Sequence, residues 1–223
     1  MEDMKNEDFL RVQFSVSDEF GKLIETTDME EAKKADIYSE KAKYGYSLVM
    51  MADTRMVKGF REALLGAKDG EEKTAKIAKA DAFGDRREDL VVLVPMKKFQ
   101  GSGISPQVGM VVDLDGSRGR VQSISSGRVR VDLNHELAGR DVIYKFKIID
   151  RITGPKMKLN ALVEEQLNLK NAVTIDGDYG SVNVPQETMN QDDYLQWKYS
   201  AIAAAMQYIP ELKKIEWKEE FTR

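Results

Sequence analysis

The sequence contains no cysteine and a single histidine, His135. Without thiols the chain cannot form a disulfide, a thiolate metal site or a cysteine nucleophile. One imidazole cannot build a histidine-rich zinc site within the chain, and a serine triad would have to use His135. The composition excludes these classes of chemistry, and we expect neither a bound metal nor a cofactor.

Long apolar runs and a strong charge of one sign are also missing. The longest apolar run, about residues 201–206, is far below the ~18 residues that cross a bilayer. The first residues are polar and acidic, whereas a signal peptide starts basic and continues apolar. A net charge of -4 provides no global field that would attract nucleic acid or an anionic membrane. We expect a cytoplasmic protein without a membrane partner; the net charge disfavours nucleic acid as a partner but leaves a local basic patch open.

Hydrophobic residues make up 42% of the chain and charged residues 32%, which is enough apolar surface for a folded core. The alternation of residues 9–16 and the turn after them predict a β-hairpin that returns over residues 22–25. Residues 59–66 predict a short helix with Phe60, Ala63 and Leu64 on one face. We expect a helix-prone stretch over residues 29–43 and further strands at residues 47–51 and 71–78. These elements indicate an α+β fold.

From residue 87 turn signals become frequent, including Gly101-Ser102-Gly103 and Asp115-Gly116. Short strands are predicted between them, over residues 110–114, 120–124 and 128–133. The apolar strand predicted at residues 141–149 has no partner in this small unit. We therefore place it in the first sheet, which makes residues 87–136 an insertion.

After Gly154-Pro155 the pattern predicts an α-β-β-α-β unit. We expect Asn190 to cap its longer helix. The apolar stripe of that helix could pack internally or pair two chains into a homodimer; it consists of Leu195, Tyr199, Ile202, Met206 and Ile209. The expected domains are residues 1–86 with 137–152, the insertion 87–136 and the C-terminal α+β domain 153–223.

Four segments carry a resemblance to a known family. The stretches at residues 21–27, 57–71 and 81–85 resemble the FKBP-type peptidyl-prolyl cis-trans isomerases. The run Val-Asp-Leu-Asn-His-Glu-Leu-Ala-Gly at residues 131–139 is similar to the insert-in-flap (IF) domain of SlyD-like members. With its further C-terminal domain, the chain looks like the long archaeal-type members. The resemblance implies an antiparallel sheet around a short helix and an isomerase with chaperone activity toward unfolded clients and proline-containing peptides.

The resemblance also implies a pocket. Catalytic roles would fall to Phe14, Glu25, Phe83, Tyr144 and the amide N–H of Val57. Substrate-binding walls would be supplied by Ile24, Met56 and Phe60.

Departures from the family pattern affect turnover. Family members usually have Tyr where this chain has Phe14 and Phe83, an aromatic for Ile24, Asp for Glu25 and Phe for Tyr144. Two hydroxyl donors are lost, and a lost transition-state hydrogen bond costs about ten- to hundredfold in rate. We expect a pocket that accepts proline but turns it over poorly.

Other interpretations stay open at this stage. The aromatic residues could be core packing, and the protein could be a holding chaperone without isomerase activity. Arg118 and Arg120, with Arg128 and Arg130, could bind RNA, although residues 87–136 hold seven basic and six acidic side chains. A solvated strand face is the favoured interpretation of these arginines, and a structural turn that of His135.

Overall fold

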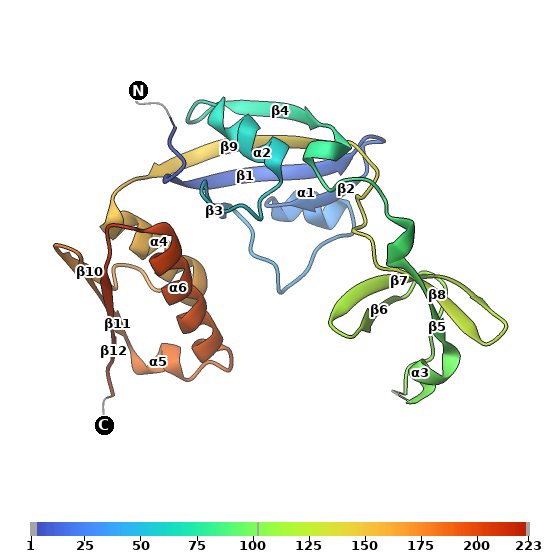
Figure 1. The fold of residues 1–223 in the computed structure, drawn as a ribbon. Coiled ribbons are helices and arrows are strands. Elements are labelled where there is room, and N and C mark those ends of the chain that lie inside the picture. The colour runs from blue at the N-terminus through green and yellow to red at the C-terminus, as the bar shows by residue number, and fades with distance from the viewer. Residues whose placement is uncertain (1–3, 102, 222–223) are drawn as a thin grey trace. The chain divides into compact units, whose positions relative to one another are not determined.

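The computed structural model describes residues 4–101 and 103–221 and has an α+β architecture (Figure 1). The chain divides into two compact units. The first takes in the chain up to Lys76 and from Ile143 onward, and the second runs from Ile77 to Val142. The structure thus interrupts the first unit with an inserted one. The turn expected at Ser102 lies outside the described residues.

The first unit contains a five-stranded sheet with the order β2-β1-β9-β4, in which β3 also pairs with β1. The strand predicted at residues 141–149 lies between β1 and β4, so its placement in the first sheet is confirmed. The strands of this sheet are β1 (Phe9–Asp18), β2 (Leu23–Thr26), β3 (Ser47–Met50), β4 (Glu72–Ile77) and β9 (Val142–Ile152).

Helix α2 (Lys58–Leu65) packs on one face of this sheet and buries Phe60 and Leu64. The Phe60 ring stacks on Tyr144 of β9 at 4.3 Å between centroids and meets Phe146 edge-on at 5.4 Å. Alternation along β9 turns these two rings toward α2 and the intervening lysine away from it. The short helix of the expected fold is therefore anchored by aromatic contacts.

Helix α1 (Met29–Lys34) is much shorter than the stretch predicted for residues 29–43. Asp28 caps its start by accepting a hydrogen bond from the Glu31 N–H at 2.9 Å. Asp36, with φ of 57°, takes a left-handed conformation that a helix cannot continue through. Charge and helix propensity predicted the start of α1 correctly but not its end.

The C-terminal region adds a three-stranded sheet in the order β10-β11-β12. Strand β11 pairs antiparallel with β10 and parallel with β12. Its core is continuous with Phe9 of β1 and Ile152 of β9. The elements are α4 (Pro155–Leu167), β10 (Val173–Asp176), β11 (Tyr179–Val184), α5 (Gln186–Met189), α6 (Tyr194–Tyr208) and β12 (Lys214–Glu219). Because this region shares a unit with the first sheet, its status as a separate domain from residue 153 stays a prediction.

Two expectations for the C-terminal region need correction or refinement. Asn190 ends the short helix α5, whereas Asp193 precedes α6, so the predicted Asn190 cap is wrong. On α6, Leu195, Tyr199 and Met206 are exposed, while Ile209 just after the helix is buried. The stripe thus packs internally only in part, and pairing of two chains through it stays a prediction.

The second unit is a small sheet in the order β5-β8-β7-β6, with antiparallel pairing throughout. Helix α3 covers its apolar face with Phe99, which packs against Val94, Val112 and Val129. Sequence patterns predicted three of the strands but neither β5 nor α3. The elements are β5 (Val91–Pro95), α3 (Met96–Gly101), β6 (Val111–Leu114), β7 (Ser117–Ser125) and β8 (Arg128–Asp132), with 3-10 turns η1 (Lys79–Asp81) and η2 (Glu88–Leu90) before β5.

Within the described residues, the helices are all too short or too polar to cross a bilayer. The cytoplasmic location stays a prediction.

A substitution at Gly119 on β7 can test the packing of the second unit. A Cβ atom there would lie 2.6 Å from Leu133 Cδ2 and 2.9 Å from the Asp132 carbonyl oxygen. We expect Gly119→Ala to destabilise this unit by about 1–3 kcal/mol through overpacking. Gly101→Ala is the control, because a Cβ atom there meets nothing within 4 Å. Thermal unfolding monitored by circular dichroism measures the difference; equal melting temperatures for the two variants would contradict the packing.

Candidate active site

A cavity of about 410 Å³ opens beside the first turn of α2, within the first unit. Six of the eight residues assigned to the pocket from sequence line it, and the others in its wall come from β3 and the segment that follows. The six are Phe14, Glu25, Met56, Val57, Phe60 and Tyr144. The additional lining residues are Ser47, Leu48, Val49, Met50, Asp53 and Arg55.

Two assigned residues are not part of this wall. Ile24 is half-buried on β2 but does not line the cavity. Phe83 belongs to the second unit, where its ring stacks on His135 with centroids 4.0 Å apart and planes within 4°. The roles of Ile24 and Phe83 in the site stay predictions.

The inner wall of the cavity is aromatic. Phe14 of β1 lies 5.7 Å from Phe60 and 6.2 Å from Tyr144, measured between ring centroids. Phe60 and Tyr144 are buried, whereas Phe14 is half-buried. These three rings come from β1, α2 and β9, which the sheet and its helix bring together. The arrangement provides an apolar surface of the kind that accepts small hydrophobic groups.

Val57 supplies a backbone donor at the rim. It precedes α2, and its carbonyl oxygen accepts the Arg61 N–H at 3.0 Å. Within the described part of the chain, no protein acceptor pairs with the Val57 N–H. A helix start leaves such N–H groups without partners inside the helix, so this one can bind a substrate carbonyl.

Two titratable groups face this apolar surface. Burial raises the pKa of Tyr144 to about 12, and the nearby Glu25 carboxylate adds to the shift. Glu25 on β2 is exposed to solvent on one side. Neighbouring atoms still desolvate its carboxyl in part, which raises the pKa of Glu25 above 4.5. Both shifts have the same main cause, which is loss of water around the group.

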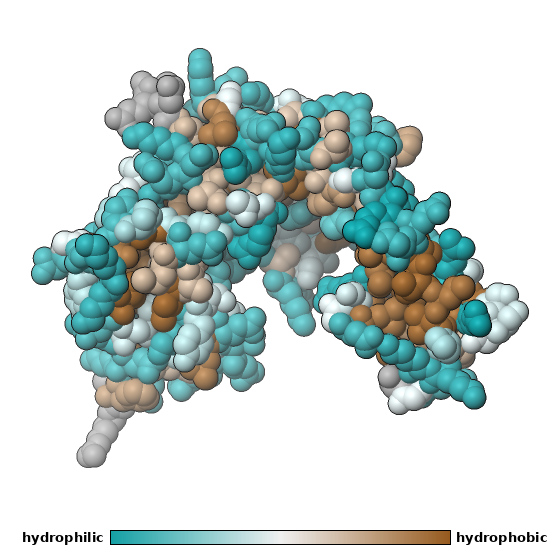
Figure 2. Space-filling model, viewed as in Figure 1, coloured by the Kyte–Doolittle hydropathy of each residue, from teal (hydrophilic) through white to brown (hydrophobic). Residues whose placement is uncertain are grey.

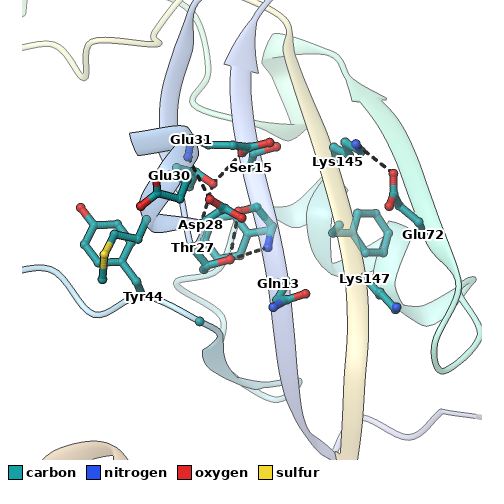
Figure 3. Close-up of a pocket in the computed structure, with 15 residues that line it drawn as sticks. Gln13, Ser15, Thr27, Asp28, Glu30, Glu31, Tyr44, Glu72, Lys145 and Lys147 are labelled. Carbon is teal, nitrogen blue, oxygen red and sulfur yellow. Dashed lines mark hydrogen bonds and ion pairs between the residues drawn. The ribbon is translucent and has the colours of Figure 1, made fainter. Parts of the chain in front are cut away.

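A second cavity of about 530 Å³ lies on the face of the sheet opposite α2 (Figure 3). Charged side chains lie on two sides of it: Glu30 and Glu31 of α1 on one side, and on the other Lys145 of β9, which pairs with Glu72 of β4 at 2.9 Å. Charged, hydrated side chains do not provide a surface that removes water from an amide. The smaller aromatic cavity is therefore the candidate active site.

The arginines considered for RNA binding lie in the second unit. Arg118 and Arg120 line a cleft of about 580 Å³ there, together with Arg86, Arg140 and acidic neighbours. Arg86 pairs with Asp132, and Arg120 lies 3.9 Å from Glu136. These pairs reduce the positive field that phosphate binding requires. RNA binding stays a prediction.

His135 has a local structural contact. Its Nδ1 accepts the Leu137 N–H at 3.2 Å, which supports the tight corner before β9. Partial burial lowers the pKa of His135, although the adjacent Glu136 opposes this effect.

Sequence reasoning missed Val49, Asp53 and Arg55 as cavity residues. The Arg55 guanidinium pairs with both oxygens of the Asp53 carboxylate, at 2.8–3.2 Å. Since Arg55 donates these hydrogen bonds, the pKa of Asp53 is lowered. The only available signal was the position of this segment directly before Met56.

Comparisons with known proteins agree with this geometry. The family described as "FKBP26, IF domain" matches residues 92–137. A short-type peptidyl-prolyl cis-trans isomerase from Methanocaldococcus jannaschii is 31% identical over 147 residues, which cover 66% of this chain and 93% of the relative.

The chain belongs to the FKBP-type peptidyl-prolyl cis-trans isomerases. Within that family it is SlyD-like, because it carries the IF domain as an insertion. A SlyD isomerase from Vibrio cholerae is 33% identical over 98 residues, 42% of this chain and 48% of the relative. A probable 16 kDa FKBP-type isomerase from Pseudomonas fluorescens is 31% identical, over 45% of this chain and 69% of the relative. The family assignment made from the sequence motifs is confirmed.

The raised pKa of Glu25 in this FKBP gives a prediction for stability. The folded protein holds the Glu25 proton more tightly than the unfolded chain, so this group lowers stability as pH rises past 4.5 and through the folded pKa. Glu25→Gln is neutral at every pH and removes that loss. We expect the free energy of unfolding of Glu25→Gln, relative to wild type, to increase from pH 4 to pH 7 by less than about 1 kcal/mol, because solvent screens a partly exposed group.

Urea unfolding at both pH values measures the effect. Glu19→Gln, in the turn between β1 and β2, is the control, since Glu19 is exposed. A relative stability of Glu25→Gln that falls toward pH 7 would contradict the raised pKa of this carboxyl.

Proposed function

We propose that the aromatic cavity binds a prolyl residue of an unfolded or flexible client and accelerates rotation of the preceding peptide bond. The observation that supports the proposal most is the joint lining of one cavity by Phe14, Phe60 and Tyr144 beside the unpaired Val57 N–H. The cavity is of sufficient size for a pyrrolidine ring, and its inner wall is apolar.

The chemistry needs no nucleophile. Rotation about the bond interrupts amide resonance, across a barrier of ~18–20 kcal/mol. The planar amide is more polar than the twisted one, so removal of water destabilises the ground state relative to the transition state. In the proposed complex the rings of Phe60 and Tyr144 exclude water, while the Val57 N–H holds a flanking carbonyl.

The same cavity supports weakened turnover. Phe14 offers no hydroxyl donor at its position in the wall. The Tyr144 hydroxyl lies in surroundings that disfavour its ionised form. The proposed site therefore relies on desolvation and one backbone donor, with fewer oriented donors than the family pattern has.

The insertion is proposed to bind exposed apolar chain. Figure 2 shows apolar side chains gathered over the second unit. Val108, Met110 and Val111 are 67%, 40% and 52% exposed; the first two precede β6, and Val111 is its first residue. Exposed apolar groups of this kind mark interaction surfaces. Client segments held there would raise the local concentration of prolyl bonds near the cavity.

Filling the cavity tests the isomerase proposal. Val49 is half-buried and lines the cavity from β3, so a phenylalanine there occupies the space of the substrate ring. We expect Val49→Phe to lower kcat/KM for a proline tetrapeptide at least tenfold. Leu195→Phe, which enlarges a side chain exposed on α6, is the matched control and retains wild-type turnover. Equal activity of the two variants would show that the reaction occurs elsewhere.

The same variants separate the isomerase from a holding chaperone without isomerase activity. If the cavity alone carries the reaction, Val49→Phe still suppresses aggregation of an unfolded client but no longer accelerates proline-limited refolding. A wild-type chain that suppresses aggregation without accelerating refolding would instead establish the holding chaperone.

The client surface is tested by changing Val108→Ser, Met110→Gln and Val111→Ser together. Loss of apolar contact area should weaken client binding and reduce suppression of aggregation by roughly three- to tenfold in the chaperone concentration required. Phe20→Gln is the control, because Phe20 is an exposed apolar residue of the first unit. Light scattering during dilution of an unfolded protein measures suppression. An equal loss in the control would argue against a dedicated surface on the insertion.

A further inference from the structure

The cleft of about 580 Å³ in the second unit follows from the register of three neighbouring strands, β6, β7 and β8 (Figure 1). Val112 of β6 packs with Phe99 of α3, so its neighbour Val111 turns to the other face of the sheet. There Val111 lies opposite Arg120 of β7, and Arg120 lies opposite Asp132 of β8. An apolar, a basic and an acidic residue therefore form a row across the cleft.

The cleft carries more positive than negative charge. Four arginines and two carboxylates line it, which leaves an excess of two positive charges; these residues are Arg86, Arg118, Arg120, Arg140, Asp132 and Glu136. His135 is also in the lining but is largely uncharged at neutral pH, because partial burial holds its pKa below 6.5. The whole chain has a net charge of -4, so this positive excess is local.

Asp132 is a buried acid whose bonds are made inside the protein. Its side chain is 7% exposed and forms an ion pair with Arg86. One carboxylate oxygen accepts the backbone N–H of Asn134 at 2.9 Å and its side-chain amide at 2.7 Å. The other accepts the side-chain amide of Gln122 at 2.9 Å. Asp132 therefore holds Arg86 in place, and neither group is left for a ligand.

The two arginines of β7 are available to a ligand. Arg120 donates from Nη1 to the Gly109 carbonyl at 3.0 Å, and its Nη2 lies 3.9 Å from the Glu136 carboxylate, which is a long ion pair. Arg118 is exposed, and within the described residues no hydrogen bond or ion pair holds its side chain. A guanidinium with free N–H groups can bind a carboxylate through two parallel hydrogen bonds.

The cleft is continuous with the client surface proposed above. Val111 is 52% exposed and belongs to that surface together with Val108 and Met110, and it also lines the cleft. The carbonyl that holds Arg120 is that of Gly109, between Val108 and Met110. An unfolded chain that contacts these apolar residues would thus bring its neighbouring side chains to the arginines.

We propose that this cleft binds a carboxylate of the client, which is an aspartate or glutamate side chain next to apolar residues, and that Arg118 and Arg120 are its donors. The insertion would then select unfolded chains that combine apolar sequence with negative charge. This inference rests on the client surface proposed above and specifies the chemistry of its ligand.

The composition of the cleft favours a single carboxylate over a nucleic acid. A nucleic-acid strand presents a phosphate at every nucleotide, and the Glu136 carboxylate would repel the phosphates that no arginine binds. One carboxylate can instead meet Arg118 and Arg120 together. Val111 and Leu133 add apolar contact area, which suits the side chains that flank an acidic residue in a peptide.

Two matched peptides test the preference. One is a short, labelled, extended peptide of apolar residues with a central glutamate, and the other has glutamine in its place. Each is titrated with the full-length protein, and fluorescence anisotropy measures Kd. We expect the glutamate peptide to bind about three- to tenfold more tightly, which lies between the effects of an exposed ion pair and of a buried hydrogen bond to a charged group. Added salt should reduce the difference.

Arg118→Gln tests the donor. Since Arg118 is exposed, its loss leaves the core intact, and we expect the preference for glutamate to fall to about twofold or less while the glutamine peptide binds as before. Arg86 is unsuitable for this test, because its loss would leave the buried Asp132 charge without its ion-pair partner. Arg128→Gln is the matched control: Arg128 is exposed on β8 in the same unit and does not line the cleft. It should keep the wild-type preference.

The outcomes separate this inference from the client surface. Equal binding of both peptides to wild type would overturn the carboxylate site and leave the client surface in place. Failure of both peptides to bind would overturn both. An equal loss of preference in Arg128→Gln would also overturn the site, because the net charge of the insertion would then be the cause. So would a single-stranded RNA oligomer that binds wild type more tightly than the glutamate peptide and loses affinity in Arg118→Gln.

Discussion

The first unit depends on one constraint: side chains of β1 and β3 alternate between the two faces of the sheet. These two strands need both faces for packing. Leu10 and Val12 are fully buried in the sheet core, whereas Phe9 joins the C-terminal core. A one-residue shift in register would exchange the two sets of side chains and empty both cores. The cavity and the C-terminal core therefore depend on the same register between β1 and β3, in which Phe9 lies opposite Met50.

Desolvation connects this packing to chemistry. The surroundings that raise the pKa of Tyr144 are the ones that would disfavour a polar, planar amide. Ionisation of Glu25 is disfavoured for the same reason. The effect is smaller there, because Glu25 remains accessible to solvent. Ionisation of Glu25 at neutral pH therefore lowers the stability of the folded protein slightly. Perturbed ionisation beside an aromatic cavity is common at functional sites, and here it coincides with an unpaired backbone donor.

Sequence patterns predicted those parts of the fold and site that depend on local signals. The hairpin, α2 and the strand that returns to the first sheet follow from periodicity and turn residues, and six cavity residues follow from family motifs. The contact of Leu48 and Met50 with the C-terminal core could not be predicted, because it joins segments that are brought together only by tertiary packing. The end of α1 depends on the left-handed Asp36, and aspartate is compatible with many conformations. The parallel pairing of β12 with β11 likewise has no local signature.

Two kinds of recognition in one chain have different specificities. Apolar contact at Val108 and Met110, where clients are proposed to bind, is non-directional and scales with buried area, so it would accept many unfolded sequences. In the proposed site, a cavity with one backbone donor at Val57 would recognise the main chain and a compact ring, with little dependence on the neighbouring side chains. Combining the two favours clients that expose apolar sequence and a prolyl bond together, which is the state of an incompletely folded chain. On this proposal, the small number of oriented polar groups would broaden the range of substrates and would also limit the rate.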